Sequence, residues 1–249
     1  MPWGMLGSPA RRKAKPRTPV GERIYAVGDI HGRADLLAAL FDRIDDDLSV
    51  RPIGDAVQVF LGDYIDRGPD SRQVLDLLIH RQRQHKVLCL KGNHEVYAVQ
   101  ALSEPSVLSE WLKMGGVATL LSYGVKPPSR DDDAQAQWET AAAFRRALPD
   151  SHHHFLLRLA PSFSYGDYFF AHAGVRPEVP LQQQYERDLL WIRDDFLLHE
   201  EDFGKVVVHG HTPAPKPDIR ANRINIDTGA YATGRLTCLV LENDQMRFL

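Results

Sequence analysis

Cysteines and long apolar runs are both scarce in this chain of 249 residues, and each scarcity excludes a class of protein. The two cysteines, Cys89 and Cys238, lie in short apolar runs and are too few for a disulfide framework. We therefore expect buried thiols and see no sign of an oxidising compartment. No run approaches the ~18 apolar residues of a membrane span, and the N-terminus lacks the apolar core of a secretory signal. These absences predict a cytoplasmic protein that does not enter a membrane.

A strong charge of one sign is also missing. Charged residues make up 25% of the chain, but the net charge is only -3, which gives no general affinity for nucleic acid or anionic membrane. The 43% of apolar residues can fill a sizeable core, and we expect a single domain over residues 23–249. Residues 1–22 differ, because basic residues and prolines there show no hydrophobic period. They predict a disordered basic tail.

Short apolar runs and helical periodicity alternate in the first part of the chain. Ile24–Val27, Val57–Leu61 and Val87–Leu90 are continuous apolar runs, typical of strands that are buried on both faces. Apolar residues at helical spacing follow the first two runs and predict crossover helices. The distance of about 30 residues from one run to the next fits a strand, a helix and a parallel return. The three strand ends should therefore meet at one edge of a sheet, where open α/β sheets bind ligands.

The middle of the chain reads as an insert rather than as a further part of the sheet. Residues at about 100–155 predict helices near 107–114 and 134–148 around an acidic loop. Within the insert, His152-His153-His154 is interpreted as a solvated turn and not as a metal-binding tract.

The last part of the chain predicts more strands. Apolar runs at Phe155–Leu159 and Phe163–Phe170 come first, and the second of them ends at a histidine. Three closely spaced runs then predict a second, largely antiparallel sheet: Val206–Val208, Ile224–Ile226 and Leu236–Leu241.

Polar motifs follow five of these strands. After the second strand, Gly62-Asp63-Tyr64-Ile65-Asp66-Arg67-Gly68 places two carboxylates and a guanidinium directly behind an apolar run. The other four motifs are Gly28-Asp29-Ile30-His31-Gly32, Gly92-Asn93-His94-Glu95, Ala171-His172-Ala173-Gly174 and Gly210-His211-Thr212. Each motif alone is weak, since an isolated histidine is more often structural than a ligand. Several of them in order at crossover spacing predict a shared site.

The motifs supply two carboxylates, one amide oxygen and three imidazoles as candidate metal ligands: Asp29, His31, Asp63, Asn93, His172 and His211. This mixture of oxygen and nitrogen suits a pair of Mn, Fe or Zn ions better than Ca, which prefers oxygen alone. Two ions about 3.5–4 Å apart need a bridging ligand, and the two oxygens of a carboxylate can provide it.

In this order, the five motifs resemble those of the calcineurin-like metallophosphoesterases, specifically the phosphoprotein phosphatase branch. The resemblance extends from about Ile24 to Leu241. Three further segments are similar to the bacterial and bacteriophage lambda type protein phosphatases: Gly115-Gly116, Leu190-Trp191-Ile192-Arg193 and Ile226-Asp227-Thr228-Gly229-Ala230. The fold implied is α/β, the metallophosphoesterase fold, with two mixed β-sheets packed as a sandwich and flanked by helices.

The resemblance also implies a role for each site residue. Asp29 and His31 would bind the first of two divalent ions, Asp63 would bridge, and Asn93, His172 and His211 would bind the second. His94, hydrogen-bonded to Asp66, would protonate the leaving oxygen, while Arg67 and Arg193 would hold the phosphoryl oxygens. A metal-bridging hydroxide would attack phosphorus in line. Mn is the expected active metal, with Fe or Zn as alternatives.

Two departures from the family pattern are informative. Many metallophosphoesterases carry a second histidine where this chain has Pro213, and its lack is the phosphoprotein phosphatase arrangement. His209 is out of register with the family ligand and is interpreted as structural.

Three functions remain open from the sequence. The first is a metal-dependent phosphatase acting on a phosphorylated protein or peptide at phosphoserine or phosphothreonine, with phosphotyrosine as a further candidate. The second is a symmetrical diadenosine tetraphosphate hydrolase, because those enzymes share the core motifs. The third is a non-catalytic binding protein that retains a metal site. The insert is slightly acidic, which predicts that a phosphopeptide is preferred to a polyanionic nucleotide.

Overall fold

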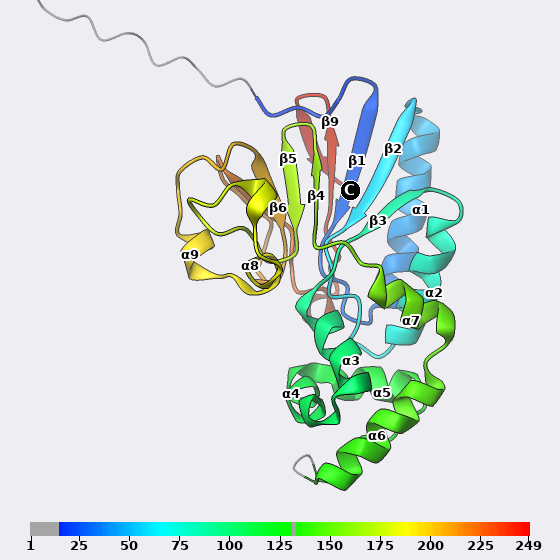
Figure 1. The fold of residues 1–249 in the computed structure, drawn as a ribbon. Coiled ribbons are helices and arrows are strands. Elements are labelled where there is room, and N and C mark those ends of the chain that lie inside the picture. The colour runs from blue at the N-terminus through cyan, green and yellow to red at the C-terminus, as the bar shows by residue number, and fades with distance from the viewer. Residues whose placement is uncertain (1–14, 131–132) are drawn as a thin grey trace, which may run out of the picture.

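The computed structural model describes residues 15–130 and 133–249, which form two five-stranded sheets with helices around them (Figure 1). Side chains from both sheets meet in one buried cluster, where Ile24 and Leu239 of the first sheet pack with Phe170 and Val208 of the second. Burial of the two apolar faces against each other closes the sandwich. The predicted α/β sandwich of two mixed sheets is confirmed.

The first sheet places the ends of three parallel strands at one edge. Its order is β10-β9-β1-β2-β3, and its register pairs Val27 with Phe60 and Phe60 with Cys89. The residues that follow these three positions therefore emerge together, as the spacing of the motifs predicted. The strands are β1 (Glu22–Val27), β2 (Asp55–Phe60), β3 (Lys86–Cys89), β9 (Cys238–Glu242) and β10 (Gln245–Phe248).

The second sheet differs from the prediction in its strand directions. Its order is β4-β5-β6-β8-β7, and β5, β6 and β8 run parallel. The predicted antiparallel arrangement is wrong because the chain between His209 and Arg223 has the dozen or so residues that a parallel return needs. The run Leu236–Leu241 is not in this sheet at all, since β9 pairs with β1. The strands are β4 (Ser162–Tyr165), β5 (Tyr168–Ala171), β6 (Val206–His209), β7 (Asp218–Ile219) and β8 (Arg223–Asn225).

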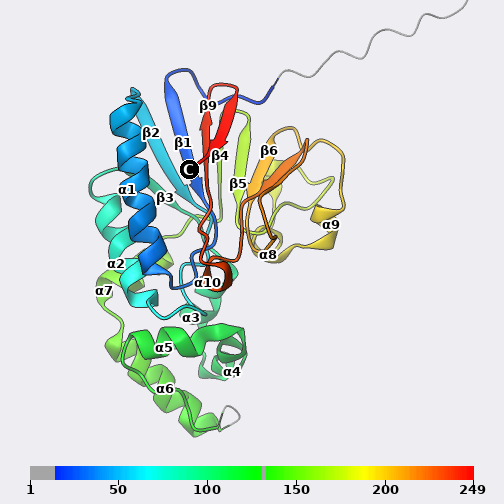
Figure 2. The ribbon, with the colours of Figure 1, turned by 180° about the vertical axis from the view of Figure 1, so that it is seen from behind.

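Helices cover the outer faces of both sheets (Figure 2). Leu37 and Leu75 of the first two helices pack with Tyr25 of β1 on one side, and Phe196 packs with Val207 of β6 on the other. Cys89 and Cys238 are buried free thiols, as expected. The covering elements are α1 (Ala34–Val50), α2 (Ser71–Gln82), η3 (Leu181–Gln183), α8 (Glu186–Trp191) and α9 (Asp194–Leu197), and α10 (Ala230–Thr233) follows β8.

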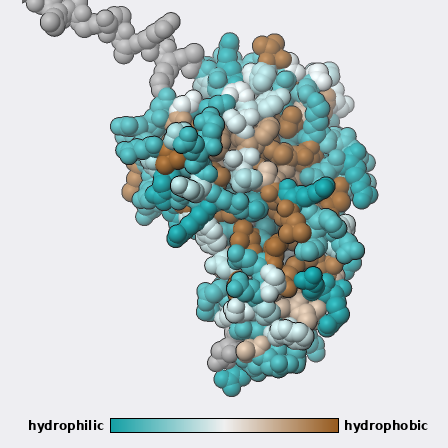
Figure 3. Space-filling view, viewed as in Figure 1, coloured by the Kyte–Doolittle hydropathy of each residue, from teal (hydrophilic) through white to brown (hydrophobic). Residues whose placement is uncertain are grey.

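The helical insert extends beyond the motif-bearing edge of the sheets (Figure 1). Its far end, where α6 lies, is mainly hydrophilic on the face seen in Figure 3. The predicted helix at 134–148 is confirmed as α6. The elements are α3 (Asn93–Ser103), η1 (Pro105–Val107), α4 (Leu108–Trp111), the π-helical η2 (Leu112–Gly116), α5 (Val117–Ser122), α6 (Ala134–Ala147) and α7 (Asp150–Leu157).

Two predictions near the end of the insert are wrong. The expected strand Phe155–Leu159 lies largely in α7, because His152, Phe155, Leu156 and Leu159 recur at helical spacing and are buried together. His152 is therefore no solvated turn residue. Its ring nitrogens lie 2.7 Å from the Tyr123 hydroxyl and 2.9 Å from an Asp76 carboxylate oxygen, which joins α7 to α5 and α2.

The expected strand Phe163–Phe170 is also corrected, because the chain turns within it. Gly166 has a φ of +55°, a left-handed conformation that glycine adopts readily. The turn divides the run into the antiparallel hairpin of β4 and β5.

Part of the predicted tail contacts the folded domain. Residues 1–14 lie outside the described residues, but Glu22 begins β1, and Thr18 is buried. The Thr18 N–H donates to the Asn243 carbonyl at 3.0 Å, and the Asp167 N–H donates to the Arg17 carbonyl at 2.9 Å. Residues 15–22 therefore join the β4-β5 and β9-β10 turns.

Two N-terminal deletions should separate the tail from this contacting segment. Removing residues 1–14 is expected to leave the thermal midpoint and kcat on a small phosphate ester unchanged. Removing residues 1–21 should lower the free energy of unfolding by about 2 kcal/mol through lost hydrogen bonds, again with little effect on kcat. Calorimetry and turnover of both deletions provide the check. A large loss of kcat in the shorter deletion would contradict the prediction.

Candidate metal centre

The predicted metal ligands all lie at the shared strand edge and are all buried. Asp29 and His31 follow β1, Asp63 follows β2, and Asn93 follows β3 as the first residue of α3. The second sheet adds His172 after β5 and His211 after β6. Their exposed fractions run from 0% to 7%: Asp29, His31, Asp63, Asn93, His172 and His211. The structure thus brings together residues that are far apart in the sequence. For example, the His211 N–H donates to the carboxylate of Asp29, 182 positions earlier.

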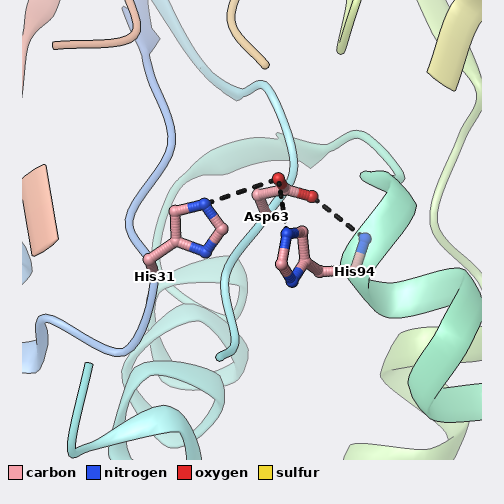
Figure 4. A group of neighbouring side chains, drawn as sticks. All are labelled: His31, Asp63 and His94. Carbon is pink, nitrogen blue, oxygen red and sulfur yellow. Dashed lines mark hydrogen bonds and ion pairs between the residues drawn. The ribbon is translucent and has the colours of Figure 1, made fainter. Parts of the chain in front are cut away.

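Asp63 lies between two groups of candidate ligands: the first group is Asp29 and His31, and the second group is Asn93, His172 and His211. Its Oδ2 is 3.5 Å from Nε2 of His31, and its Oδ1 is 3.4 Å from Nε2 of His172. Figure 4 shows the carboxylate between His31 and His94: Oδ2 faces a ring nitrogen of each histidine, and Oδ1 faces the backbone nitrogen of His94. The two oxygens of one side chain therefore face different ligand groups, which is the arrangement a bridging carboxylate requires.

The chemistry of the second group calls for a cation. Nδ1 of His172 lies 3.0 Å from the Leu61 carbonyl and must donate there, which leaves a lone pair on Nε2. That lone pair faces the Asn93 carbonyl oxygen at 2.9 Å and Nδ1 of His211 at 3.2 Å. A lone pair and an amide oxygen have no proton to share at this distance. A metal ion between them would satisfy both, so these residues fit a metal.

The first group shows the same pattern. Nδ1 of His31 donates to the Ile65 carbonyl at 2.9 Å, so Nε2 presents its lone pair towards Asp63. Burial, together with the like charges of Asp227 and Asp63, raises the pKa of Asp29 well above its ordinary value. Carboxylates crowded without a nearby cation are costly, and a divalent ion would remove that cost.

Burial keeps the three ligand imidazoles neutral, which is the form that binds metal. It lowers the pKa of His31 to about 3 and that of His211 to about 2, and it also lowers the pKa of His172. No protons need to leave these rings at neutral pH before an ion binds.

His94 and Asp66 form a hydrogen-bonded pair beside the ligands. Nδ1 of His94 lies 2.7 Å from Oδ2 of Asp66, and Arg67 Nη2 lies 3.2 Å from Nε2 of His94. Burial opposes the charged ring, but the carboxylates of Asp63 and Asp66 outweigh it, so the pKa of His94 is raised. A raised pKa suits a group that gives up a proton near neutral pH.

Both predicted phosphate-binding arginines are exposed at the mouth of the centre. Arg67 lies over the Tyr231 ring at 4.9 Å, and Arg193 donates to the Thr212 hydroxyl at 3.2 Å. Within the described ranges, one donor of each guanidinium contacts a neutral group, His94 for Arg67 and Thr212 for Arg193, and no ion pair with a carboxylate is found, so the remaining donors can bind an anion.

A cleft of about 650 Å³ opens beside Arg193. Trp191 in its wall contacts the His211 ring edge to face at 6.3 Å, which connects the cleft to the second ligand group. Arg176 in the cleft is paired with Asp188 and Asp195. The lining residues are Arg176, Tyr185, Arg187, Asp188, Trp191, Ile192, Arg193, Asp194 and Asp195.

The backbone is strained where the ligands lie. Positive φ angles occur at His31 (45°), Asp63 (51°), Asp66 (71°), Arg67 (66°) and His211 (65°). Such conformations cost about 1 kcal/mol or more for a residue with a side chain, and they cluster at functional sites.

Sequence reasoning missed residues that hold this strained loop. Glu95 is buried and accepts the N–H groups of Gly92, Asp63 and Tyr64 at 2.8–2.9 Å. Its position three residues after Gly92, at the start of α3, lets a Glu side chain reach back to the N-cap N–H, and this spacing was a signal in the sequence. Tyr231, whose ring centroid lies 5.4 Å from that of His31, had no such signal.

His209 lies away from the ligand atoms, as its register in the sequence suggested. It is buried on β6, and its ring contacts Phe196 at 4.9 Å on the outer side of the second sheet. The placement supports a packing role.

Comparison with known proteins connects this site to a family. The model of the calcineurin-like phosphoesterase family matches residues 22–242. Serine/threonine-protein phosphatase 1 of Salmonella typhimurium is 33% identical, over 86% of this chain and 89% of that protein. The asymmetrical bis(5'-nucleosyl)-tetraphosphatase PrpE of Anoxybacillus flavithermus is 27% identical, over 86% and 88%. A cold-active protein-tyrosine phosphatase of a Shewanella species shares the fold, with a TM-score of 0.60, 15% identity and coverage of 93% and 80%.

Proposed function

Because this chain belongs to the calcineurin-like phosphoesterase family, in its phosphoprotein phosphatase branch, we propose that it is a metal-dependent phosphatase of phosphoserine and phosphothreonine in proteins. Phosphotyrosine is a further candidate substrate. The observation that carries the proposal is the Asp63 carboxylate, whose two oxygens face different ligand groups with the His94–Asp66 pair at its side. A cytoplasmic location stays a prediction from the sequence; no helix in the described ranges is long and apolar enough to cross a membrane.

Members of this family use a dinuclear centre of divalent metals, and the buried ligands fit one. Asp29 and His31 would hold one ion, Asn93, His172 and His211 the other, and Asp63 both. When bound, the ions would lower the pKa of the attacking water and neutralise the charge that develops on the phosphoryl oxygens. The ligand set suits Mn, with Fe and Zn as alternatives.

The remaining roles belong to side chains around the centre. Arg67 and Arg193 bind the phosphoryl oxygens, since their planar forks match that geometry. His94 gives a proton to the leaving oxygen from Nε2, while Asp66 holds the ring through Nδ1. Arg67 now donates to the same Nε2, which therefore carries a lone pair. Before His94 can act as an acid, Arg67 must turn towards the phosphoryl group and Nε2 must take up a proton from solvent.

A second candidate, hydrolysis of a dinucleoside tetraphosphate, is supported by the cleft. Tyr185 is 72% exposed there, so its ring could stack on a nucleotide base. Arg187 has no ion pair within the described ranges, so its guanidinium could bind a phosphate. The relative from Anoxybacillus carries the name of such an enzyme, although of the asymmetrical type. Two acidic residues of the insert do not argue against this substrate, because Asp133 caps α6 and Glu139 lies in α6, at the far end of the insert (Figure 1).

The ranking of these substrates is a direct test. Among the described residues, two guanidinium groups without a carboxylate partner, Arg67 and Arg193, match one phosphoryl group at the mouth. A tetraphosphate brings several negative charges, and the described part of the cleft adds only one further unpaired cation, Arg187, whose charge is offset by Asp194. We expect kcat/KM for a phosphopeptide to exceed that for diadenosine tetraphosphate by about tenfold, at equal Mn and ionic strength. A higher kcat/KM for diadenosine tetraphosphate than for the phosphopeptide would assign the protein to the second function, provided that Arg187→Ala abolishes this preference. Failure to hydrolyse p-nitrophenyl phosphate with Mn would instead indicate a binding protein.

A further inference from the structure

The carboxylate of Asp66 is held by the helical insert. Nε1 of Trp111 in α4 donates to Oδ2 at 2.8 Å, on the same oxygen that binds His94. The hydroxyl of Thr119 in α5 donates to Oδ1 at 2.5 Å and accepts the Asp66 N–H at 2.9 Å. All four side chains are at least 99% buried. Both oxygens of Asp66 are thus fixed by donors that come from outside the sheet.

The spacing of the insert residues explains how they reach the same loop. Trp111, Gly115 and Thr119 recur every fourth position, and η2, between the first and the last, is kinked at Gly115. Gly115 has a φ of +113°, and its carbonyl accepts the Arg67 N–H at 3.2 Å. A Cβ on Gly115 would lie 2.8 Å from Cγ of Arg67, so only glycine allows this approach.

We propose that Trp111 and Thr119 are positioning residues for the proton donor His94, acting through Asp66. The inference rests on the proposed phosphatase activity. His94 can present Nε2 to a leaving oxygen only while Nδ1 is held, and Nδ1 is held by a carboxylate whose rotation these two donors prevent. Through these two residues the insert positions the proton donor, in addition to any role in substrate choice.

The test compares esters with good and poor leaving groups. Trp111→Phe keeps an aromatic ring against Phe144 but loses the N–H, and Thr119→Val keeps the shape but loses the hydroxyl. Both variants should lose about tenfold or more in kcat on phenyl phosphate, which needs a proton on its leaving oxygen. On p-nitrophenyl phosphate, whose leaving group needs little protonation, the loss should stay below about threefold.

A matched control lies on the same insert. Tyr123→Phe also removes a buried hydroxyl, but that hydroxyl contacts His152 and not Asp66. It should leave the ratio of the two kcat values unchanged. An equal loss on both esters in the Trp111 and Thr119 variants, or the same ratio change in Tyr123→Phe, would overturn the proposal.

Two further measurements separate positioning from folding and from the proposed function itself. In a His94→Asn background, Trp111→Phe should cause no further loss on phenyl phosphate, because its effect passes through His94; an additive loss contradicts the proposal. The low-field proton resonance of the His94 Nδ1–H should shift in Trp111→Phe and stay in place in Tyr123→Phe, and an unmoved resonance also contradicts it. If the wild type hydrolyses neither ester, the proposed function fails rather than this assignment.

Discussion

Asp63→Asn is expected to remove both metal ions and to lower kcat by about 10³-fold or more. The side chain keeps its size, but one oxygen becomes an amide nitrogen that donates and cannot bind a cation. Because Oδ2 faces His31 and Oδ1 faces His172, either orientation of the amide spoils one ligand group and removes the negative charge shared by both. Metal catalysis is worth several kcal/mol, and each 1.36 kcal/mol is tenfold in rate.

The metal content of the purified variant, measured by mass spectrometry, is the direct readout. Asp29→Asn serves as the comparison, since Asp29 belongs to the first group alone and should cost one ion. Thermal melting of the metal-free proteins shows whether the fold survives. Two tightly bound ions in Asp63→Asn, or the loss of only one, would refute the bridging role.

His94→Asn is expected to lower kcat by about 10²–10⁴-fold while both metals stay bound. The loss should be largest on phenyl phosphate and phosphoserine peptides and smallest on p-nitrophenyl phosphate. The reason is that His94 has a carboxylate partner on Nδ1 and lies beside the candidate ligands without being one of the six. Metal analysis and the leaving-group series together distinguish this role from metal binding.

His152→Asn is the matched control for that variant. His152 is also a buried histidine with an aspartate partner, since it contacts Asp76 and Tyr123, but it lies in the insert away from the ligands. It should lower thermal stability and leave the dependence on the leaving group unchanged. An equal loss of kcat on esters with good and poor leaving groups in His94→Asn, or a loss of bound metal, would contradict the general-acid assignment.

The sequence predicted the first half of the site because local patterns determine it. Short apolar runs at crossover spacing fix β1, β2 and β3 as parallel neighbours, so the residues after Val27, Phe60 and Cys89 meet at one edge. The ligands on those loops follow from that topology. The family resemblance supplied the roles of these residues, which spacing alone does not give.

The misses have two physical causes. A short apolar run does not show which strand it pairs with. The sequence therefore predicts Leu236–Leu241 in the second sheet, although β9 pairs with β1. It also predicts a strand at Phe155–Leu159, although the buried residues there recur at helical spacing. Contacts between distant segments have no local signature either. The bonds from Trp111 and Thr119 to Asp66 cross about 50 positions and became visible only in the folded chain.

The position of β9 beside β1 also constrains how the protein is made. Arg23 at the start of the domain pairs in register with Glu242 near its end, so the first sheet cannot be completed until the C-terminal strands have left the ribosome. Until then β1, with Ile24, Tyr25, Ala26 and Val27 in a row, is an unpaired apolar edge. Products of premature termination that stop just before β9 should therefore aggregate even though all six candidate metal ligands are already present in them. The nascent chain needs protection of that edge for nearly its whole synthesis.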